Sequence, residues 1–279
     1  MPLPLKKRLR RFRMAVQTAL GLGDQGFFTP YRYAAGAKDP SGYPEIEAVM
    51  AERAEVMRGV LSQIDGLKEK MAAIGGDPAP QPRWDQGWFA PVDAAVAYAL
   101  VHNTAPARII EVGSGHSTRF LARALKDKDA QANHICIDPQ PRADLLDLPV
   151  RWEQALLSED HLSLFDTLEA GDIAFFDSSH ILWPGLDVDL IFNRILPRLK
   201  PGVRVHIHDI FLPDPYPANW KWRGYTEQNG LSGWFIGGAY EVEFASHYAN
   251  TRLDALSHVA HLPRHPQAID ASLWMVKKA

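Results

Sequence analysis

Cysteine is almost absent from this chain of 279 residues, which contains only Cys136. A single cysteine cannot form an intramolecular disulfide, so no disulfide framework is available to hold the fold together. Long apolar runs are absent too, because no stretch reaches the roughly 20 residues of a membrane-spanning helix. With 46% apolar residues, the chain is expected to bury a large core in a reducing, cytoplasmic setting.

A large excess of either charge is also absent. The formal net charge is -3, which argues against nucleic-acid binding as the main task. The N-terminus departs from this average, since the first acid, Asp24, comes after a run of basic residues: Lys6, Lys7, Arg8, Arg10, Arg11 and Arg13. We interpret this run as a solvated terminus without stable membrane insertion; weak contact with an acidic lipid surface is the alternative, and residues 14–22 make a poor signal-peptide core.

The most informative stretch is Ile-Ile-Glu-Val-Gly-Ser-Gly-His-Ser-Thr at residues 109–118. Its apolar start predicts a buried strand, and Ser117 is expected to cap the helix that follows. Gly113 and Gly115 allow positive φ angles and a close approach of ligand to backbone, while Glu111 supplies a carboxylate at the end of the strand. Such a turn is typical of a nucleotide-binding site.

The same pattern recurs three times downstream. Apolar runs at 134–137, 172–176 and 203–207 end in polar residues, which are Asp138, then Asp177-Ser-Ser-His180, then His208-Asp209. Strands that alternate with helices predict a Rossmann-like, doubly wound, mostly parallel α/β sheet, whose ligands bind beyond the carboxyl ends of the strands. Clustered carboxylates repel one another, so a polyhydroxyl or cationic ligand is expected at this edge.

On these segments the chain resembles the class I S-adenosylmethionine-dependent methyltransferases, and most of all the bacterial small-molecule enzymes among them. The resemblance covers roughly residues 84–279 and implies S-adenosylmethionine as cofactor and a small-molecule acceptor methylated on oxygen or nitrogen. It implies that the cofactor is bound by Glu111, Gly113, Ser114, Gly115, Asp138 and Asp177. Asp138 would accept hydrogen bonds from the ribose hydroxyls, and Asp177 would lie near the methyl-transfer centre.

The resemblance also places His180, His208 and Asp209 in the acceptor pocket. Methyl transfer requires a positioned nucleophile and removal of its proton, and because histidine titrates near neutral pH we favour His180 or His208 as the base. Some relatives hold a divalent metal with two aspartates and an asparagine. Asp177 and Asp209 fit that pattern, but Ile210 stands at the expected asparagine, so no metal ligand is assigned.

Two other classes of protein stay open. A NAD-dependent oxidoreductase also needs a glycine turn and a ribose-binding acid, but Thr118 replaces the third glycine of its fingerprint, and the Lys200-Pro-Gly202 turn matches methyltransferases. The other alternative is a non-catalytic cofactor-binding module. The acidic residues retained at the strand ends argue against it. The sequence names neither the acceptor nor the oligomeric state.

The chain is expected to divide into two parts. Residues 1–83 hold the basic N-terminus, a helical appendage with apolar spacing at 44–74 and a stiff Pro-rich connector. Residues 84–279 form the methyltransferase domain, with an aromatic-rich insertion at about 211–240 that covers the substrate or, alternatively, buries the edge of the sheet. Residues 272–276 predict the last strand, which in the family pairs antiparallel at the sheet edge.

Overall fold

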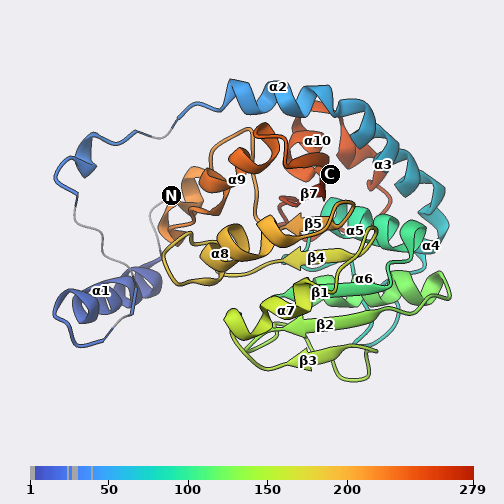
Figure 1. Ribbon diagram of the computed structural model, residues 1–279, viewed down its shortest axis with the longest axis horizontal. Coiled ribbons are helices and arrows are strands. Elements are labelled where there is room, and N and C mark those ends of the chain that lie inside the picture. The colour runs from blue at the N-terminus through green and yellow to red at the C-terminus, as the bar shows by residue number, and fades with distance from the viewer. Residues whose placement is uncertain (1–3, 24, 27–30, 39) are drawn as a thin grey trace.

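A seven-stranded sheet forms the centre of the computed structural model, which describes residues 4–23, 25–26, 31–38 and 40–279 (Figure 1). The strand order is β3-β2-β1-β4-β5-β7-β6. The strands are β1 (Arg108–Val112), β2 (Asn133–Ile137), β3 (Arg151–Glu153), β4 (Ile173–Phe176), β5 (Arg204–Ile207), β6 (Tyr240–Ala245) and β7 (Leu273–Lys277). Strands β1 to β5 run parallel, whereas β7 is antiparallel to both β5 and β6. The predicted mostly parallel sheet with an antiparallel last strand is therefore confirmed.

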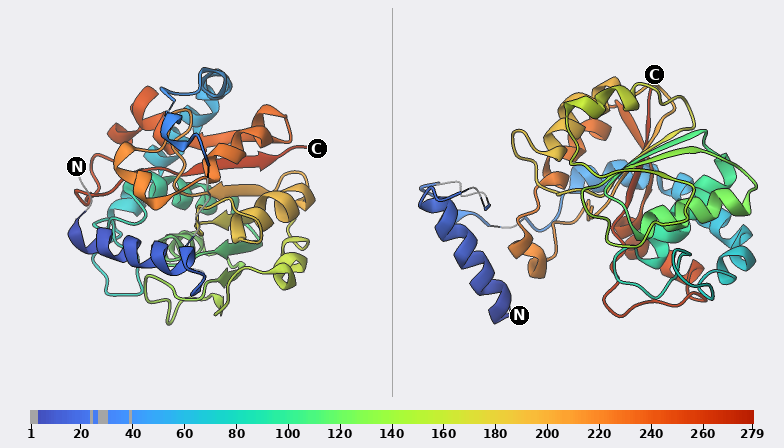
Figure 2. Two further views of the ribbon diagram at one scale, coloured as in Figure 1. Left: turned by 90° about the vertical axis from the view of Figure 1, so that its left-hand side faces the viewer. Right: turned by 90° about the horizontal axis from the view of Figure 1, so that it is seen from below.

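Helices cover both faces of the sheet, which explains why the central strands are continuous apolar runs. All four residues of β4 are fully buried. Figure 2 shows α5 (Pro91–Thr104) and α6 (His116–Asp127) on one side of the sheet. The other side carries α7 (Leu162–Phe165), α8 (Asp187–Leu190) with the π-helical turn Ile191–Ile195, and α9 (Glu227–Ile236).

The segment 44–74 forms three helices, where the apolar spacing suggested one. They are α2 (Pro44–Glu52), α3 (Ala54–Gly66) and α4 (Lys68–Ala72). The first break lies at Arg53, whose Nε donates to the carbonyl oxygen of Val242 in β6 at 3.0 Å. Helix α3 packs on α5 and β6, and the apolar stripe of the three helices joins the same core as the sheet.

The remaining helices are peripheral to the sheet. Helix α1 (Leu5–Ala19) stands apart from the body and has no buried residue (Figures 1 and 2). Short helices follow β6, namely α10 (Ser246–Arg252) and α11 (Ala255–His258). Turns of 3-10 helix occupy Ala34–Gly36, Glu159–His161, Leu196–Arg198 and Ala218–Arg223. Within the described ranges, no helix combines the length and the apolar character that crossing a membrane requires.

Candidate active site

The carboxyl ends of four parallel strands meet along one edge of the sheet. The pairing register places Val112 beside Ile137 and Phe176, and Phe176 beside Ile207. Four residues directly follow these strands at this edge: Gly113, Asp138, Asp177 and His208. Ligands of open α/β sheets bind at such an edge.

Gly113 lets the ends of β1 and β4 come together. Its φ is +78°, and its N–H donates to the carbonyl oxygen of Ile137 at 3.0 Å. A Cβ at this position would lie 1.8 Å from the carbonyl oxygen of Asp177, so only glycine fits. Gly115, with φ +154°, precedes α6 and donates its N–H to Oγ1 of Thr118 at 2.9 Å. The threonine at the third glycine position of the dinucleotide fingerprint thus stabilises the turn.

Asp138 fixes the turn from the side of β2. Its Oδ2 accepts hydrogen bonds from the N–H (2.6 Å) and the hydroxyl (3.1 Å) of Ser114, and its Oδ1 accepts one from the N–H of Gln140 (2.7 Å). An ionised carboxylate offers about four lone-pair sites, so about one stays open to a ligand. We call the adjoining cavity of about 290 Å³ the strand-end cavity; its lining consists of residues 112–114, 137–140, 155–157, 177–179, Arg142 and Asp187.

Glu111 does not line the strand-end cavity. Its fully buried carboxylate accepts hydrogen bonds from the hydroxyl of Ser117 and from Nε2 of His134 at 3.1 Å. Ser117, expected as the helix cap, therefore ties α6 to β1 instead. Glu111, His134 and Cys136 also form the one group of potential metal ligands, among the residues that the structure describes, whose ligand atoms lie within 4.8 Å of one another. The hydrogen bonds of Glu111 with Ser117 and His134 connect β1 to α6 and β2, so this cluster stabilises the elements on either side of the glycine turn.

His180 lies at the centre of a buried ion cluster. Its Nδ1 is 2.9 Å from Oε2 of Glu227, and its Nε2 is 3.2 Å from Oδ1 of Asp177 and 3.5 Å from Oδ2 of Asp209. His180 and Asp209 both have positive φ, +60° and +57°. Non-glycine residues adopt this conformation where the surrounding structure enforces it, often at functional sites. The loops after β4 and β5 thus bring the imidazole and its carboxylates together.

The ion cluster keeps His180 protonated at neutral pH. Burial alone would lower the pKa of His180, but the hydrogen bonds with Asp177 and Glu227 and the charge of Asp209 outweigh it and raise that pKa well above its ordinary 6.5. Burial would raise the pKa of Asp177, but the charge of His208 and the hydrogen bond from His180 outweigh it and hold that pKa well below 3.8. The site therefore favours the imidazolium form of His180 beside the ionised carboxylate of Asp177.

Two further cationic groups flank the carboxylate of Asp209. Nε2 of His208 lies 3.7 Å from its Oδ1, and Nη1 of Arg223 lies 3.8 Å from its Oδ2. Burial lowers the pKa of His208, but the charges of Asp177, Asp209 and Asp93 outweigh it, so the pKa of His208 rises above its ordinary value. His180, His208 and Arg223 therefore all approach the carboxylate of Asp209.

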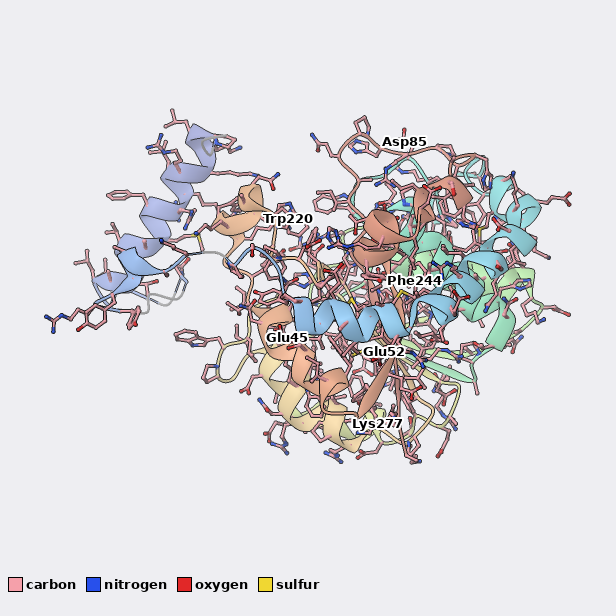
Figure 3. All side chains as sticks on the ribbon, turned by 90° about the horizontal axis from the view of Figure 1, so that it is seen from above. Glu45, Glu52, Asp85, Trp220, Phe244 and Lys277 are labelled. Atoms are coloured by element: carbon pink, nitrogen blue, oxygen red, sulfur yellow. The ribbon has the colours of Figure 1, made fainter. Side chains whose placement is uncertain are left out.

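A larger cavity of about 800 Å³, the polar cavity, adjoins the strand-end cavity. Asp177 and Arg142 line both cavities. The remaining lining consists of Lys7, Arg83, residues 85–88, residues 208–209, residues 219–220, Arg223, residues 265–267 and Ile269. In Figure 3, Trp220 and Asp85 lie on opposite sides of this region. Ligands in the two cavities would meet at Asp177.

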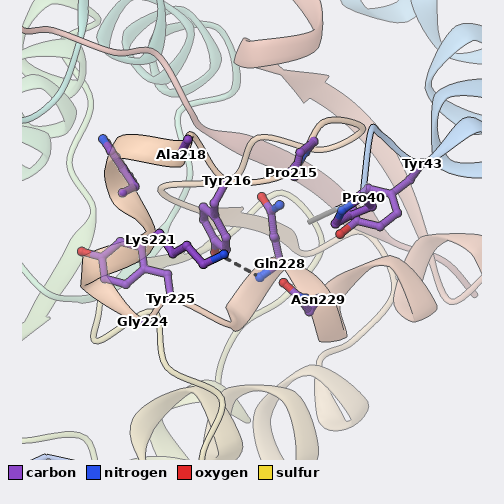
Figure 4. A pocket seen from close by; sticks show the side chains of 11 residues that line it. Pro40, Tyr43, Pro215, Tyr216, Ala218, Lys221, Gly224, Tyr225, Gln228 and Asn229 are labelled. Atoms are coloured by element: carbon purple, nitrogen blue, oxygen red, sulfur yellow. Dashed lines mark hydrogen bonds between the residues drawn. The ribbon is translucent and has the colours of Figure 1, made fainter. Parts of the chain in front are cut away.

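A third cavity, of about 170 Å³, is lined mostly by residues of the segment 211–240 (Figure 4). Trp220 lines both this cavity and the polar cavity, while Tyr216 and Tyr225 line the smaller one. The ring of Tyr225 has its centroid 4.6 Å from that of His180, and the guanidinium of Arg223 stacks 3.8 Å from the ring centroid of Trp220. This segment thus forms one wall of the site.

The residues expected from the sequence take different positions in the site. Those that line the cavities are Gly113, Ser114, Asp138, Asp177, His208 and Asp209. Gly115 and Glu111 support the turn, and His180 lies behind the aspartates. Sequence reasoning left out Arg142, Arg223 and the role of Glu227. Arg142 follows the acid of β2 closely and could have been noticed, whereas nothing local in the sequence links Glu227 to a histidine 47 residues away.

Comparison with known proteins gives one family match. Residues 110–210 match the family model of a methyltransferase domain. No curated protein matches the chain.

Several solved structures are similar at low identity. The O-methyltransferase from Bacillus cereus in complex with SAH has 17% identity and a TM-score of 0.44, covering 78% of this chain and 91% of its own. The SAH-bound methyltransferase PaMTH1 from Podospora anserina has 14% identity and a TM-score of 0.41, covering 91% and 100%. The branched-chain polyamine synthase from Thermus thermophilus has 14% identity and a TM-score of 0.40, covering 78% and 63%.

Proposed function

We propose that the protein is an S-adenosylmethionine-dependent methyltransferase that methylates an oxygen or nitrogen of a small molecule, a proposal supported by the match of residues 110–210 to the family model of a methyltransferase domain. The observation that carries the proposal is the meeting of the strand-end cavity and the polar cavity at Asp177. A polar cavity of about 800 Å³ has the size of a small-molecule pocket. The family match favours a methyltransferase over the NAD-dependent oxidoreductase.

The lining of the strand-end cavity offers contacts that suit S-adenosylmethionine. Gly113 lets the ends of β1 and β4 approach closely, since a Cβ there would collide with Asp177, and Asp138 keeps about one acceptor site for a ribose hydroxyl. Asp177 stays ionised, which suits a cationic sulfonium nearby. The bound cofactor supplies an electrophilic methyl group, which leaves positioning and proton removal to the protein.

We assign proton removal to Asp209. A general base must be unprotonated before the reaction, and the raised pKa values of His180 and His208 make both imidazoles less suited to this role than an acid at the same place. Asp209 lines the polar cavity, and its Oδ2 faces Nε2 of His180. His180 then acts as a positioning residue that holds Asp177 and Asp209, whereas Asp209 accepts the proton of the hydroxyl or amine as its new bond to carbon forms.

Asp209→Asn is expected to lower kcat about 100-fold or more, because the amide keeps the shape of the side chain but cannot accept a proton. Affinity for S-adenosylmethionine should hold within about twofold, since Asp209 does not line the strand-end cavity. Asp85→Asn is the matched control, because Asp85 lines the polar cavity but is exposed and lies outside the ion cluster. Steady-state kinetics and calorimetry measure both effects, and equal kcat values for the two variants would refute the assignment.

Asp138→Ala is expected to weaken S-adenosylmethionine binding about 10- to 100-fold, since it removes a charged acceptor and the anchor of Ser114. Isothermal titration calorimetry gives the two dissociation constants. Asp144→Ala is a close control, because Asp144 likewise accepts a hydrogen bond from the N–H two residues on, that of Leu146 at 2.9 Å, outside the strand-end cavity. Equal losses in both variants would mean that loop order, rather than ligand contact, sets the affinity.

The function itself is tested by S-adenosylhomocysteine release in the presence of small hydroxylated and amino compounds. We expect at least one acceptor to raise the release above its acceptor-free rate in the native protein and not in Asp209→Asn. Release with protein or nucleic acid alone would contradict a small-molecule acceptor. Binding of S-adenosylmethionine without release from any acceptor would favour the non-catalytic module.

A further inference from the structure

Helix α1 turns an apolar stripe toward solvent. At about 3.6 residues per turn, Leu5, Leu9, Phe12 and Val16 lie on one side of the helix. Leu5, Leu9 and Phe12 are 69%, 59% and 70% exposed, although core-facing helices bury such residues. Beyond the end of the helix, Leu20 and Leu22 are also exposed, at 67% and 74%.

The protein body touches the opposite side of α1. Lys7, which lies across the helix from the stripe, places its Nζ 4.4 Å from the ring centroid of Trp222 and lines the polar cavity. Figure 2 shows α1 set off from the sheet and its covering helices, and Figure 3 shows Trp220 on the segment between α1 and the rest of the body. The apolar stripe is therefore not a core face that the fold has covered.

Basic residues border the stripe on both sides. On one side these are Lys6, Arg10 and Arg13, and on the other Arg8 and Arg11. No ion pair with a carboxylate is found for any of them in the described part of the chain. The first acid of the sequence comes only at Asp24. A partner that covers the stripe must offer an apolar region for the stripe itself and negative charge beside it for the basic residues.

We propose that α1 docks on the surface of a membrane that contains anionic lipids. A helix of this composition lies in the plane of the interface, with its apolar side chains among the acyl chains and its Lys and Arg side chains at the level of the phosphates. With 15 residues α1 is too short to span a bilayer. The bilayer surface complements both the stripe and its two basic borders, and the contact of Lys7 keeps this docking helix at the rim of the polar cavity.

Flotation of the full-length protein with lipid vesicles tests this docking. We expect binding to vesicles of phosphatidylcholine enriched in phosphatidylglycerol, weaker binding in high salt, and little binding to phosphatidylcholine alone. Phe12→Ser should lower the partition coefficient about 10-fold or more. Met14→Ser, an apolar-to-polar change on the opposite, half-buried side of the same helix, should leave it within about twofold.

Several outcomes would overturn the proposal. One is absence of binding to the anionic vesicles, and another is equal binding to the neutral ones. A third is an unchanged partition coefficient for Phe12→Ser in a variant whose Tm equals that of the native protein. Concentration-dependent self-association that Phe12→Ser abolishes, measured by analytical ultracentrifugation without lipid, would assign the stripe to a second copy of the chain. None of these readouts depends on methyl transfer, so they stand apart from the test of the enzyme's activity.

Discussion

Gly113→Ala is expected to abolish S-adenosylmethionine binding and to lower the free energy of unfolding by about 3 kcal/mol. The added Cβ would lie 1.8 Å from the carbonyl oxygen of Asp177. That carbonyl cannot easily retreat, since the N–H of the same residue donates to Val112 at 2.8 Å within the β1–β4 pairing. The turn must therefore move away from β4, which removes the close approach on which the strand-end cavity depends. Urea denaturation and calorimetric titration measure the two losses.

The control for this variant separates the collision from the strain of a positive φ. Gly238 has φ +79°, almost equal to the +78° of Gly113, but a Cβ there would meet no atom within 4 Å. Gly238→Ala should therefore lower the free energy of unfolding by about 1 kcal/mol and leave cofactor affinity unchanged. Equal destabilisation of the two variants, or retained cofactor binding in Gly113→Ala, would contradict the collision argument.

The central strands could be predicted because burial on both faces gives them uninterrupted apolar runs. Strands β1, β2, β4, β5 and β7 each lie within about one residue of the expected range. Strand β3 is a short edge strand of three residues with an exposed Trp152, so it carries no such run. Strand β6 is not predicted, because its first residue, Tyr240, falls at the end of the predicted aromatic insertion. The break at Arg53, whose side chain contacts β6, could not be foreseen either, because no glycine or proline marks it in the sequence.

The sequence predicts which residues lie at the ends of the strands in the site, but it does not predict which side chains these residues contact. The pattern of an apolar run followed by an acid located Asp138, Asp177 and Asp209, because parallel strands end at a common edge. The same pattern predicts Glu111 as a cofactor-binding carboxylate at the end of its strand. In the structure this carboxylate instead contacts His134 within the sheet. The protonation of His180 depends on Glu227 in α9, and that contact arises only when the segment after β5 folds back over the site.

His180→Ala is expected to lower the free energy of unfolding by about 3–5 kcal/mol, because it leaves the buried carboxylates of Glu227 and Asp209 without their central cation. His258→Ala is the matched control. His258 also lies 2.9 Å from a carboxylate, that of Asp65, but the pair is exposed, so its loss should lower the free energy of unfolding by only about 0.2–1 kcal/mol.

The pH dependence of the same variant tests the charge of His180. The pKa of His180 is raised in the folded protein above its ordinary 6.5, so its protonation stabilises the fold fully below about pH 6.5 and the stabilisation is lost as pH rises through the raised value. The difference in unfolding free energy between the native protein and His180→Ala should therefore be larger at about pH 6 than at about pH 9. Because the charge of His180 lowers the pKa of His208, the same comparison is made in a His208→Ala background, where the titration of His208 is absent. A difference that stays constant over this range would mean that His180 is neutral in the fold, and the base could then be His180 rather than Asp209.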